Sequence, residues 1–181
     1  MTATVNKRTK IHEARVFTLT RENITLENGV TTDLDVLRHP GASAIVPMSD
    51  ADTLVLIRQY RHAIGDHIWE IPAGTLDPGE APLACAKREL TEETGFSGNT
   101  WQKLGEITPL PGYSDERIHI FLASDLDPAE QNLDSDEVLD VHHIPLAQAL
   151  EMIYKGDIQD SKSIAGIFLA VHCLNQQKEV S

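Results

Sequence analysis

Alternating polar and apolar positions dominate residues 11 to 40, where helix-favouring residues are few. This two-residue period predicts half-buried strands at Ala14–Leu19 and Thr32–Leu37. Glu27–Gly29 lies between them and offers the chemistry of a tight turn. The first part of the chain therefore predicts a small antiparallel β region.

The middle of the chain is richer in strand-forming residues. Ala42–Pro47 and Thr53–Tyr60 predict two strands, separated by the turn signal Ser49–Asp52. Strand character resumes at Ile118–Ala123, after a segment that contains several prolines. These strands are apolar enough to form part of a buried sheet.

Three segments predict helices. The first runs from about Pro82 to Thr94, because proline suits a first helical turn and Gly95 suits a left-handed C-terminal cap. The others lie near Leu146–Tyr154 and Ser163–Leu174, and the last is apolar on one side. Strands interspersed with helices predict an α/β or α+β layered fold.

Composition narrows the functional classes. The formal net charge of −13 argues against binding to a nucleic acid backbone, which needs clustered Lys and Arg. A small phosphorylated substrate is still compatible, because a multivalent cation can join anions to carboxylates. The sequence contains neither a membrane-length apolar stretch nor an apolar leader, and Cys85 and Cys173 form no disulfide framework. We therefore expect a cytoplasmic protein that acts away from membranes.

A fixed spacing of glycine and acidic residues carries the candidate chemistry. Gly74 is followed after five residues by Glu80, and after seven more by the run Arg88–Phe96. Within that run Glu89, Glu92 and Glu93 stand at i, i+3 and i+4, which places them on one face of a helix. Such like-charge pairs cost an isolated helix about 0.2–0.5 kcal/mol each. A solvated acidic face and a site for a hard divalent cation both fit this pattern, and the surrounding spacing favours the cation.

This spacing resembles the Nudix box, so the chain resembles the Nudix hydrolases over residues 74–96. The resemblance implies an α/β/α sandwich with a mixed sheet between helices. It also implies metal-assisted attack of water on the pyrophosphate of a nucleoside diphosphate linked to another group. We expect residues 1–40 to form an N-terminal β-domain and residues 41–181 to form the Nudix domain.

The resemblance also implies roles for single residues. Glu89 and Glu93 correspond to the main metal ligands, Glu92 is adjacent and counts as both a metal and a catalytic candidate, and the carbonyl of Ala73 is a further ligand. The implied cofactor is Mg²⁺, with Mn²⁺ as an alternative, and it would polarise phosphoryl oxygens and lower the pKa of water. Arg88 would orient the glutamates, Gly74 would permit close backbone approach, and Glu80 would give structural support.

The flanks of the box contain Gln59–Arg61, Trp69–Gly74 and a proline cluster at Pro109–Glu116. They resemble the ADP-ribose pyrophosphatase group, which implies ADP-ribose as substrate. Arg61 would hold the diphosphate, because a guanidinium offers forked donors to phosphate. Glu70 would accept hydrogen bonds from adenine or ribose, and Trp69 and Pro111 complete the candidate binding residues. A surface arginine and a strand-edge carboxylate are the alternative interpretations of Arg61 and Glu70.

The same group takes its catalytic base from a later loop, and Glu137 in the acidic stretch 132–138 is our candidate. Asp136, Asp134 and Glu116 are the substitutes, and a solvated acidic loop is the alternative.

The N-terminal strands resemble a region through which these enzymes form homodimers. Candidates for stacking on the base are Phe17, Tyr60, Trp69 and Tyr113, each of which could equally be a core residue. Two other functions are kept: a pyrophosphatase of nucleotide sugars such as GDP-mannose or ADP-glucose, and a domain that senses ADP-ribose without cutting it.

Overall fold

The computed structural model describes residues 3–135 and 137–180, without the side chains of residues 178–180. The chain divides into two compact units. Unit 1 comprises Met1–Gly41 and Thr108–Arg117, and unit 2 comprises Ala42–Ile107 and Ile118–Ser181. No described helix is both long and apolar enough to cross a membrane.

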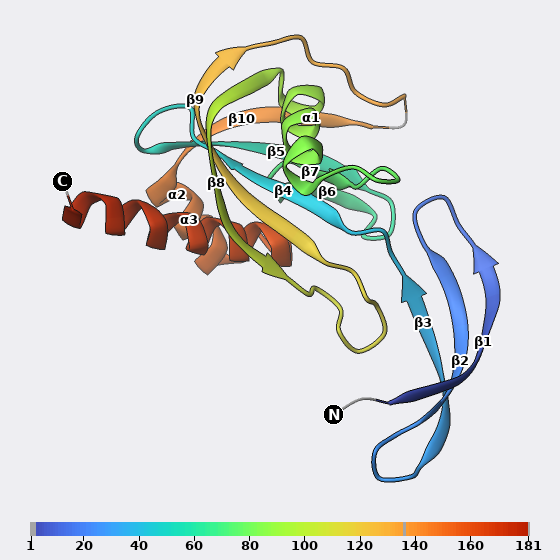
Figure 1. The fold of residues 1–181 in the computed structure, drawn as a ribbon. Coiled ribbons are helices and arrows are strands. Elements are labelled where there is room, and N and C mark those ends of the chain that lie inside the picture. The colour runs from blue at the N-terminus through green and yellow to red at the C-terminus, as the bar shows by residue number, and fades with distance from the viewer. Residues whose placement is uncertain (1–2, 136, 181) are drawn as a thin grey trace. The chain divides into compact units, whose positions relative to one another are not determined.

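Unit 1 is built on an antiparallel sheet in the order β1-β2-β3 (Figure 1). Its strands are β1 (Thr4–Glu13), β2 (Thr18–Thr25) and β3 (Thr31–Arg38). The strand predicted at Ala14–Leu19 is wrong in most of its length, because the chain turns there and the Ala14 amide donates to the Phe17 carbonyl at 2.9 Å. The strand predicted at Thr32–Leu37 is confirmed as β3.

A buried carboxylate stabilises this small sheet. Glu22 is 2% exposed, and it accepts hydrogen bonds from Arg8 at 2.8 Å and from Arg38 at 2.6 Å. Burial works to raise the pKa of Glu22, but the hydrogen bonds from Arg8 and Arg38 outweigh it and lower the pKa to about 2. Unit 1 is therefore held partly by a desolvated ionic cluster in addition to its few buried apolar side chains.

Unit 2 contains two sheets. The first is mixed, in the order β7-β4-β9-β8, with β4 and β9 parallel. Its strands are β4 (Ala42–Pro47), β7 (Ala73–Thr75), β8 (Phe96–Ile107) and β9 (Ile118–Pro128). The second is antiparallel, in the order β10-β5-β6, with β5 (Thr53–Arg61), β6 (Asp66–Glu70) and β10 (Leu139–Pro145).

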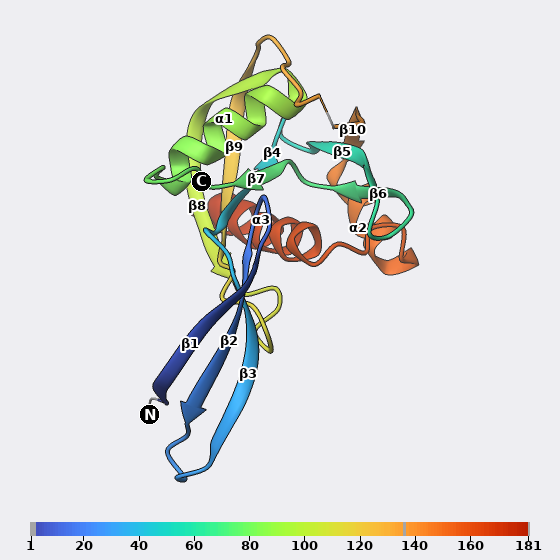
Figure 2. The same cartoon turned by 90° about the vertical axis from the view of Figure 1, so that its right-hand side faces the viewer.

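Helices cover both faces of the mixed sheet (Figure 2). These are α1 (Pro82–Thr94) and α3 (Ser161–Val180), whereas α2 (Leu146–Lys155) packs on β5, β10 and α3. Because successive strand residues face opposite sides, β4 sends Ile45 toward α1 and its neighbours Ala44 and Val46 toward α3. The expected α/β/α sandwich with a mixed sheet is thus the observed architecture.

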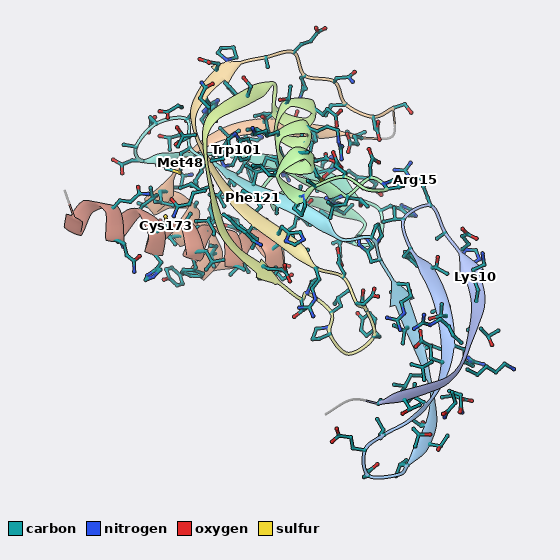
Figure 3. All side chains as sticks on the ribbon, viewed as in Figure 1. Lys10, Arg15, Met48, Trp101, Phe121 and Cys173 are labelled. Atoms are coloured by element: carbon teal, nitrogen blue, oxygen red, sulfur yellow. The ribbon has the colours of Figure 1, made fainter. Side chains whose placement is uncertain are left out.

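The smaller of the two cores lies under α1. Ala86 and Leu90 of the helix pack there against Ile45 and Phe121 of the sheet. Trp101 meets Phe121 edge to face, with ring centroids 6.5 Å apart, on neighbouring strands β8 and β9 (Figure 3). This apolar contact fixes the inner face of α1 on the sheet, and so determines where its acidic face lies.

Candidate active site

Helix α1 is set by local chemistry at both ends. Pro82 occupies its first turn, and Gly95 ends it with a left-handed φ of 72° while its amide donates to the Thr91 carbonyl. The Ser43 hydroxyl of β4 donates to the Pro82 carbonyl at 2.8 Å, which ties the start of the helix to the sheet. The predicted helix is therefore present with its predicted caps.

Arg88 joins the acidic residues of the box. Its guanidinium donates to both oxygens of Glu80, at 3.0 and 2.9 Å. It also donates to Glu89 at 2.6 Å, to Glu92 at 3.1 Å and to the Thr75 carbonyl at 3.2 Å. The hydrogen bonds from Arg88 lower the pKa of Glu80 to about 2. Arg88 thus holds three carboxylates and the backbone before the helix in one arrangement.

Two carboxylates approach the backbone of β7. A Cβ atom at Gly74 would lie 1.8 Å from Glu89 Oε1, so only glycine leaves room for this carboxylate. The Ala73 amide donates to Glu93 Oε2 at 2.8 Å. The backbone of residues 73 and 74 and the carboxylates of Glu89 and Glu93 therefore share one small region.

Both of these carboxylates are buried, and burial destabilises their charged forms. Burial raises the pKa of Glu89 to about 7, against the opposing influence of Arg88. Burial and the neighbouring charge of Glu89 also raise the pKa of Glu93, which is 1% exposed. The charge of Glu137 also works to raise both pKa values, so Glu137 lies within electrostatic range of the pair.

This donor set fits a hard divalent cation. Two desolvated carboxylates with raised pKa values would be stabilised in their charged forms by a cation, and carboxylate and carbonyl oxygens are the ligands that Mg²⁺ and Mn²⁺ prefer. Among residues 3–135 and 137–180, no three His, Cys, Asp or Glu side chains already form a metal-ligand group. The carboxylates of Glu89 and Glu92 are instead held by Arg88.

Strands β5 and β6 place a cation beside the acidic pair. Arg61 donates to Glu70 from Nε at 2.7 Å and from Nη2 at 3.2 Å. Burial works to lower the pKa of Arg61, but the hydrogen bond from Arg61 to Glu70 and the charges of Glu70 and Glu93 raise it overall. The Arg61 side chain is 39% exposed, so part of its guanidinium is free to meet a ligand.

The environment of Glu70 differs from the one that the sequence suggested. Glu70 is 3% exposed, and its two oxygens accept hydrogen bonds from Arg61 and from Lys162. A carboxylate with two cationic partners is suited to holding Arg61 in place. Its predicted contact with adenine or ribose has no support in this geometry.

Sequence reasoning missed Lys162 and Asp160, which lie at the start of α3. Asp160 accepts hydrogen bonds from the amide and hydroxyl of Ser163 at 2.9 and 2.6 Å, as an N-terminal helix cap does. An aspartate just before an apolar helix was a usable signal for this cap. Lys162 had no such signal, because its partner Glu70 is 92 residues away in the sequence.

Other candidates lie elsewhere. Trp69 packs against the larger core, and its ring is in a T-shaped contact with that of His142 at a centroid distance of 4.7 Å. Asp134 lies in the same loop as Glu137 and its amide donates to Glu137 Oε2 at 3.0 Å, whereas Asp136 lies outside the described residues. The remaining candidates that belong to unit 1 are Phe17, Pro111, Tyr113 and Glu116.

Comparison with known proteins gives a consistent family. The model of the NUDIX domain matches residues 37–166. The ADP-ribose pyrophosphatase of Mycobacterium tuberculosis is 37% identical over 91% of this chain and 80% of its own. The GDP-mannose pyrophosphatase of Citrobacter koseri is 35% identical over 79% of this chain and 86% of its own. A crystal structure of an ADP compounds hydrolase superposes with a TM-score of 0.86 at 28% identity, covering 98% of this chain and 96% of that one.

Proposed function

The chain belongs to the Nudix family, and from this premise we propose that it hydrolyses the pyrophosphate of ADP-ribose to AMP and ribose 5-phosphate. The observation that carries the proposal is the approach of Glu89 and Glu93 to the backbone of residues 73 and 74, with Arg61 in electrostatic range of Glu93. It combines carboxylates that suit a divalent cation with a guanidinium that suits a diphosphate. Likeness to an ADP-ribose pyrophosphatase over most of the chain supports the choice of substrate.

In this proposal the acidic face of α1 holds Mg²⁺, with Mn²⁺ as an alternative. Glu89, Glu93 and the Ala73 carbonyl are the ligands, with Glu92 adjacent. When bound, the cation neutralises charge on the phosphoryl oxygens and lowers the pKa of the attacking water. Arg88 keeps the glutamates in place through its contacts with Glu80, Glu89 and Glu92.

The substrate is held and attacked by residues of unit 2. Arg61 binds the diphosphate through the part of its guanidinium that Glu70 leaves free. Glu137 accepts a proton from the attacking water, a role that is supported by its electrostatic interaction with Glu89 and Glu93. Of the aromatic candidates for stacking on the base, Tyr60 and Trp69 belong to this unit.

The experiment that tests the proposal is a product analysis with purified protein and Mg²⁺. ADP-ribose, ADP-glucose, GDP-mannose, NADH, diadenosine polyphosphate and 8-oxo-dGTP form the panel. We expect ADP-ribose to give AMP and ribose 5-phosphate with the highest kcat/KM. Faster cleavage of a nucleotide sugar would make that compound, instead of ADP-ribose, the proposed substrate. Binding of ADP-ribose without cleavage of any compound would indicate a sensor.

The metal assignment has its own test in Glu93→Gln. This variant should keep the fold and lose turnover by orders of magnitude, because it removes a buried ligand from α1. The matched control is Glu151→Gln, since Glu151 is a helix residue with a side chain that is 67% exposed. Near-normal activity of Glu93→Gln would refute the assignment.

A nucleotide-sugar pyrophosphatase is the second candidate. The similarity to a GDP-mannose pyrophosphatase favours it, and it would use the same glutamates and Arg61. The sensor function has less support, because each box residue that holds the proposed cation is intact.

We also propose that residues 1–40 mediate a homodimer and that the enzyme works in the cytoplasm. All ten residues of β1 are exposed, and large apolar side chains such as Val5, Ile11 and Leu34 are 46–47% exposed. A second copy of the chain would cover this surface. Sedimentation of the full chain tests the dimer, and a monomer at micromolar concentration would argue against it.

A further inference from the structure

A buried lysine at the start of α3 lies behind the arginine that is proposed to bind the diphosphate. The Lys162 side chain is 11% exposed, although lysine is rarely buried without partners. Its ammonium group donates to Glu70 Oε1 at 2.5 Å and to Asp160 Oδ2 at 2.9 Å. Two carboxylates therefore compensate the charge of Lys162 within hydrogen-bonding distance.

The second oxygen of Glu70 continues this chain of contacts. Glu70 Oε2 accepts from Arg61 Nε at 2.7 Å, and Glu70 Oε1 accepts from Arg61 Nη2 at 3.2 Å in addition to Lys162. Two donors of the Arg61 guanidinium, Nε and Nη2, are thus held by the two oxygens of Glu70. Because Glu70 is 3% exposed, water cannot readily replace Lys162 as the partner that orients it.

The same turn of α3 is anchored to the backbone of the metal-binding region. Ser163 Oγ accepts from the Ile71 amide at 2.8 Å and donates to Asp160 at 2.6 Å. Two residues after Ile71, the Ala73 amide donates to Glu93 at 2.8 Å. Side chains at the start of α3 thus contact both the strand that carries Glu70 and the backbone that leads to Ala73.

We infer that Lys162 is a positioning residue for substrate binding: it holds Glu70, and Glu70 holds Arg61 in the orientation that meets the diphosphate. This rests on the proposed function, because the proposed role of Arg61 is to bind a diphosphate. Without Lys162, Glu70 becomes a buried carboxylate with Arg61 as its remaining cationic partner. Glu70 then draws Arg61 toward itself and away from the substrate.

The first measurement compares Lys162→Met with Lys155→Met, a control on the exposed α2 lysine. Lys162→Met should raise KM for ADP-ribose more than it lowers kcat, with kcat/KM reduced about 10–100-fold, as for a misplaced binding group. Lys155→Met should leave both constants unchanged. An unchanged KM in a folded Lys162→Met protein would overturn the inference.

A double-mutant cycle separates positioning from general destabilisation. If Lys162 acts through Arg61, Lys162→Met should lower kcat/KM much less in an Arg61→Ala background than in the wild type. Equal losses in both backgrounds would mean that Lys162 supports the fold alone. Should Lys162→Met fail to fold, Lys162→Gln replaces the ammonium group by a neutral donor that reaches one bond less far, and its cycle with Arg61→Ala has the same two outcomes.

A measurement without substrate keeps this inference separate from the proposed function. The Nε–H signal of Arg61 in a ¹⁵N spectrum reports its pairing with Glu70, and assignment comes from its loss in Arg61→Ala. We expect this signal to shift in Lys162→Met, which removes the donor to Glu70, and to stay in place in Lys155→Met. If the substrate panel fails for the wild type while the signal shifts, the positioning contact stands and the proposed function falls. An unshifted signal overturns the inference whatever the substrate is.

Discussion

The buried carboxylate of Glu89 makes the stability of the metal-free protein fall as pH rises. Its pKa in the folded chain is about 7 and its ordinary value is 4.5, so the folded state binds more protons than the unfolded state between these values. The stabilisation that the folded state gains from protonated Glu89 is complete below pH 4.5 and is lost as pH rises through about 7. A pKa raised from 4.5 to about 7 corresponds to about 3 kcal/mol at pH 8.

Glu89→Gln should remove this penalty. The amide keeps the shape of the side chain and can still accept from Arg88, but it carries no charge to desolvate. With a chelator present, the variant should therefore be more stable than the wild type at pH 8 and similar to it at pH 5, with a difference of up to about 3 kcal/mol. Urea denaturation followed by tryptophan fluorescence at both pH values measures it.

Two controls define what would refute this reasoning. Glu151→Gln changes a side chain that is 67% exposed on α2 and pairs with Lys155, and it should leave the pH dependence as in the wild type. Excess Mg²⁺ should stabilise the wild type at pH 8 and have little effect on Glu89→Gln, because ligands that bind the folded state stabilise it. If Glu89→Gln were less stable than the wild type at pH 8 without metal, burial of a charged Glu89 would not be the cost inferred here.

Three further outcomes are expected. Gly74→Ala should lose activity, because its Cβ would lie 1.8 Å from Glu89 Oε1 and displace this carboxylate, whereas Gly112→Ala has open space and should match the wild type in turnover. Glu137→Gln should lower kcat for ADP-ribose by about 10²–10⁴-fold with little change in KM, and a normal kcat would return the role of base to Asp134 or Asp136. Glu22→Gln should weaken unit 1 above pH 4.5, because the lowered pKa of about 2 gives Glu22 a stabilising effect that is present above pH 4.5 and lost as pH falls toward 2. Hydrogen exchange of the β2 amides measures this loss of stability, and protection equal to that of the wild type at pH 7 would contradict the prediction.

The parts of the fold that the sequence predicted are those with a local periodic signal. Helix α1 followed from its caps and its spacing, and β4 followed from its apolar run. Strand β1 gave no signal, because every residue in Thr4–Glu13 is exposed and its regular structure depends on pairing with β2. The short strand β7 was missed for a similar reason, since three residues after Pro72 carry too little pattern to predict a strand.

The residues of the candidate site show the same difference between local sequence signals and long-range contacts. The glutamates of the box share one helix face, so their spacing alone brought them together. The buried position of Glu70 and its contact with Lys162 depend on how β6 meets α3, and no local pattern encodes such a contact. Glu70 therefore looked like a ligand-binding carboxylate in the sequence, and the structure gives it two cationic partners instead.

A shortage of free positive charge explains why this acidic protein needs a metal ion to bind an anion. The chain has a formal net charge of −13, and the cations nearest the site already have partners. Arg88 is held by Glu80, Glu89 and Glu92, and Lys162 is held by Glu70 and Asp160. Arg61 alone among these three is more than a third exposed, and one guanidinium cannot neutralise a diphosphate beside buried glutamates. In the proposed function, the glutamates that repel the substrate in the metal-free protein are the groups that would recruit the cation, so one set of carboxylates would control both substrate binding and hydrolysis.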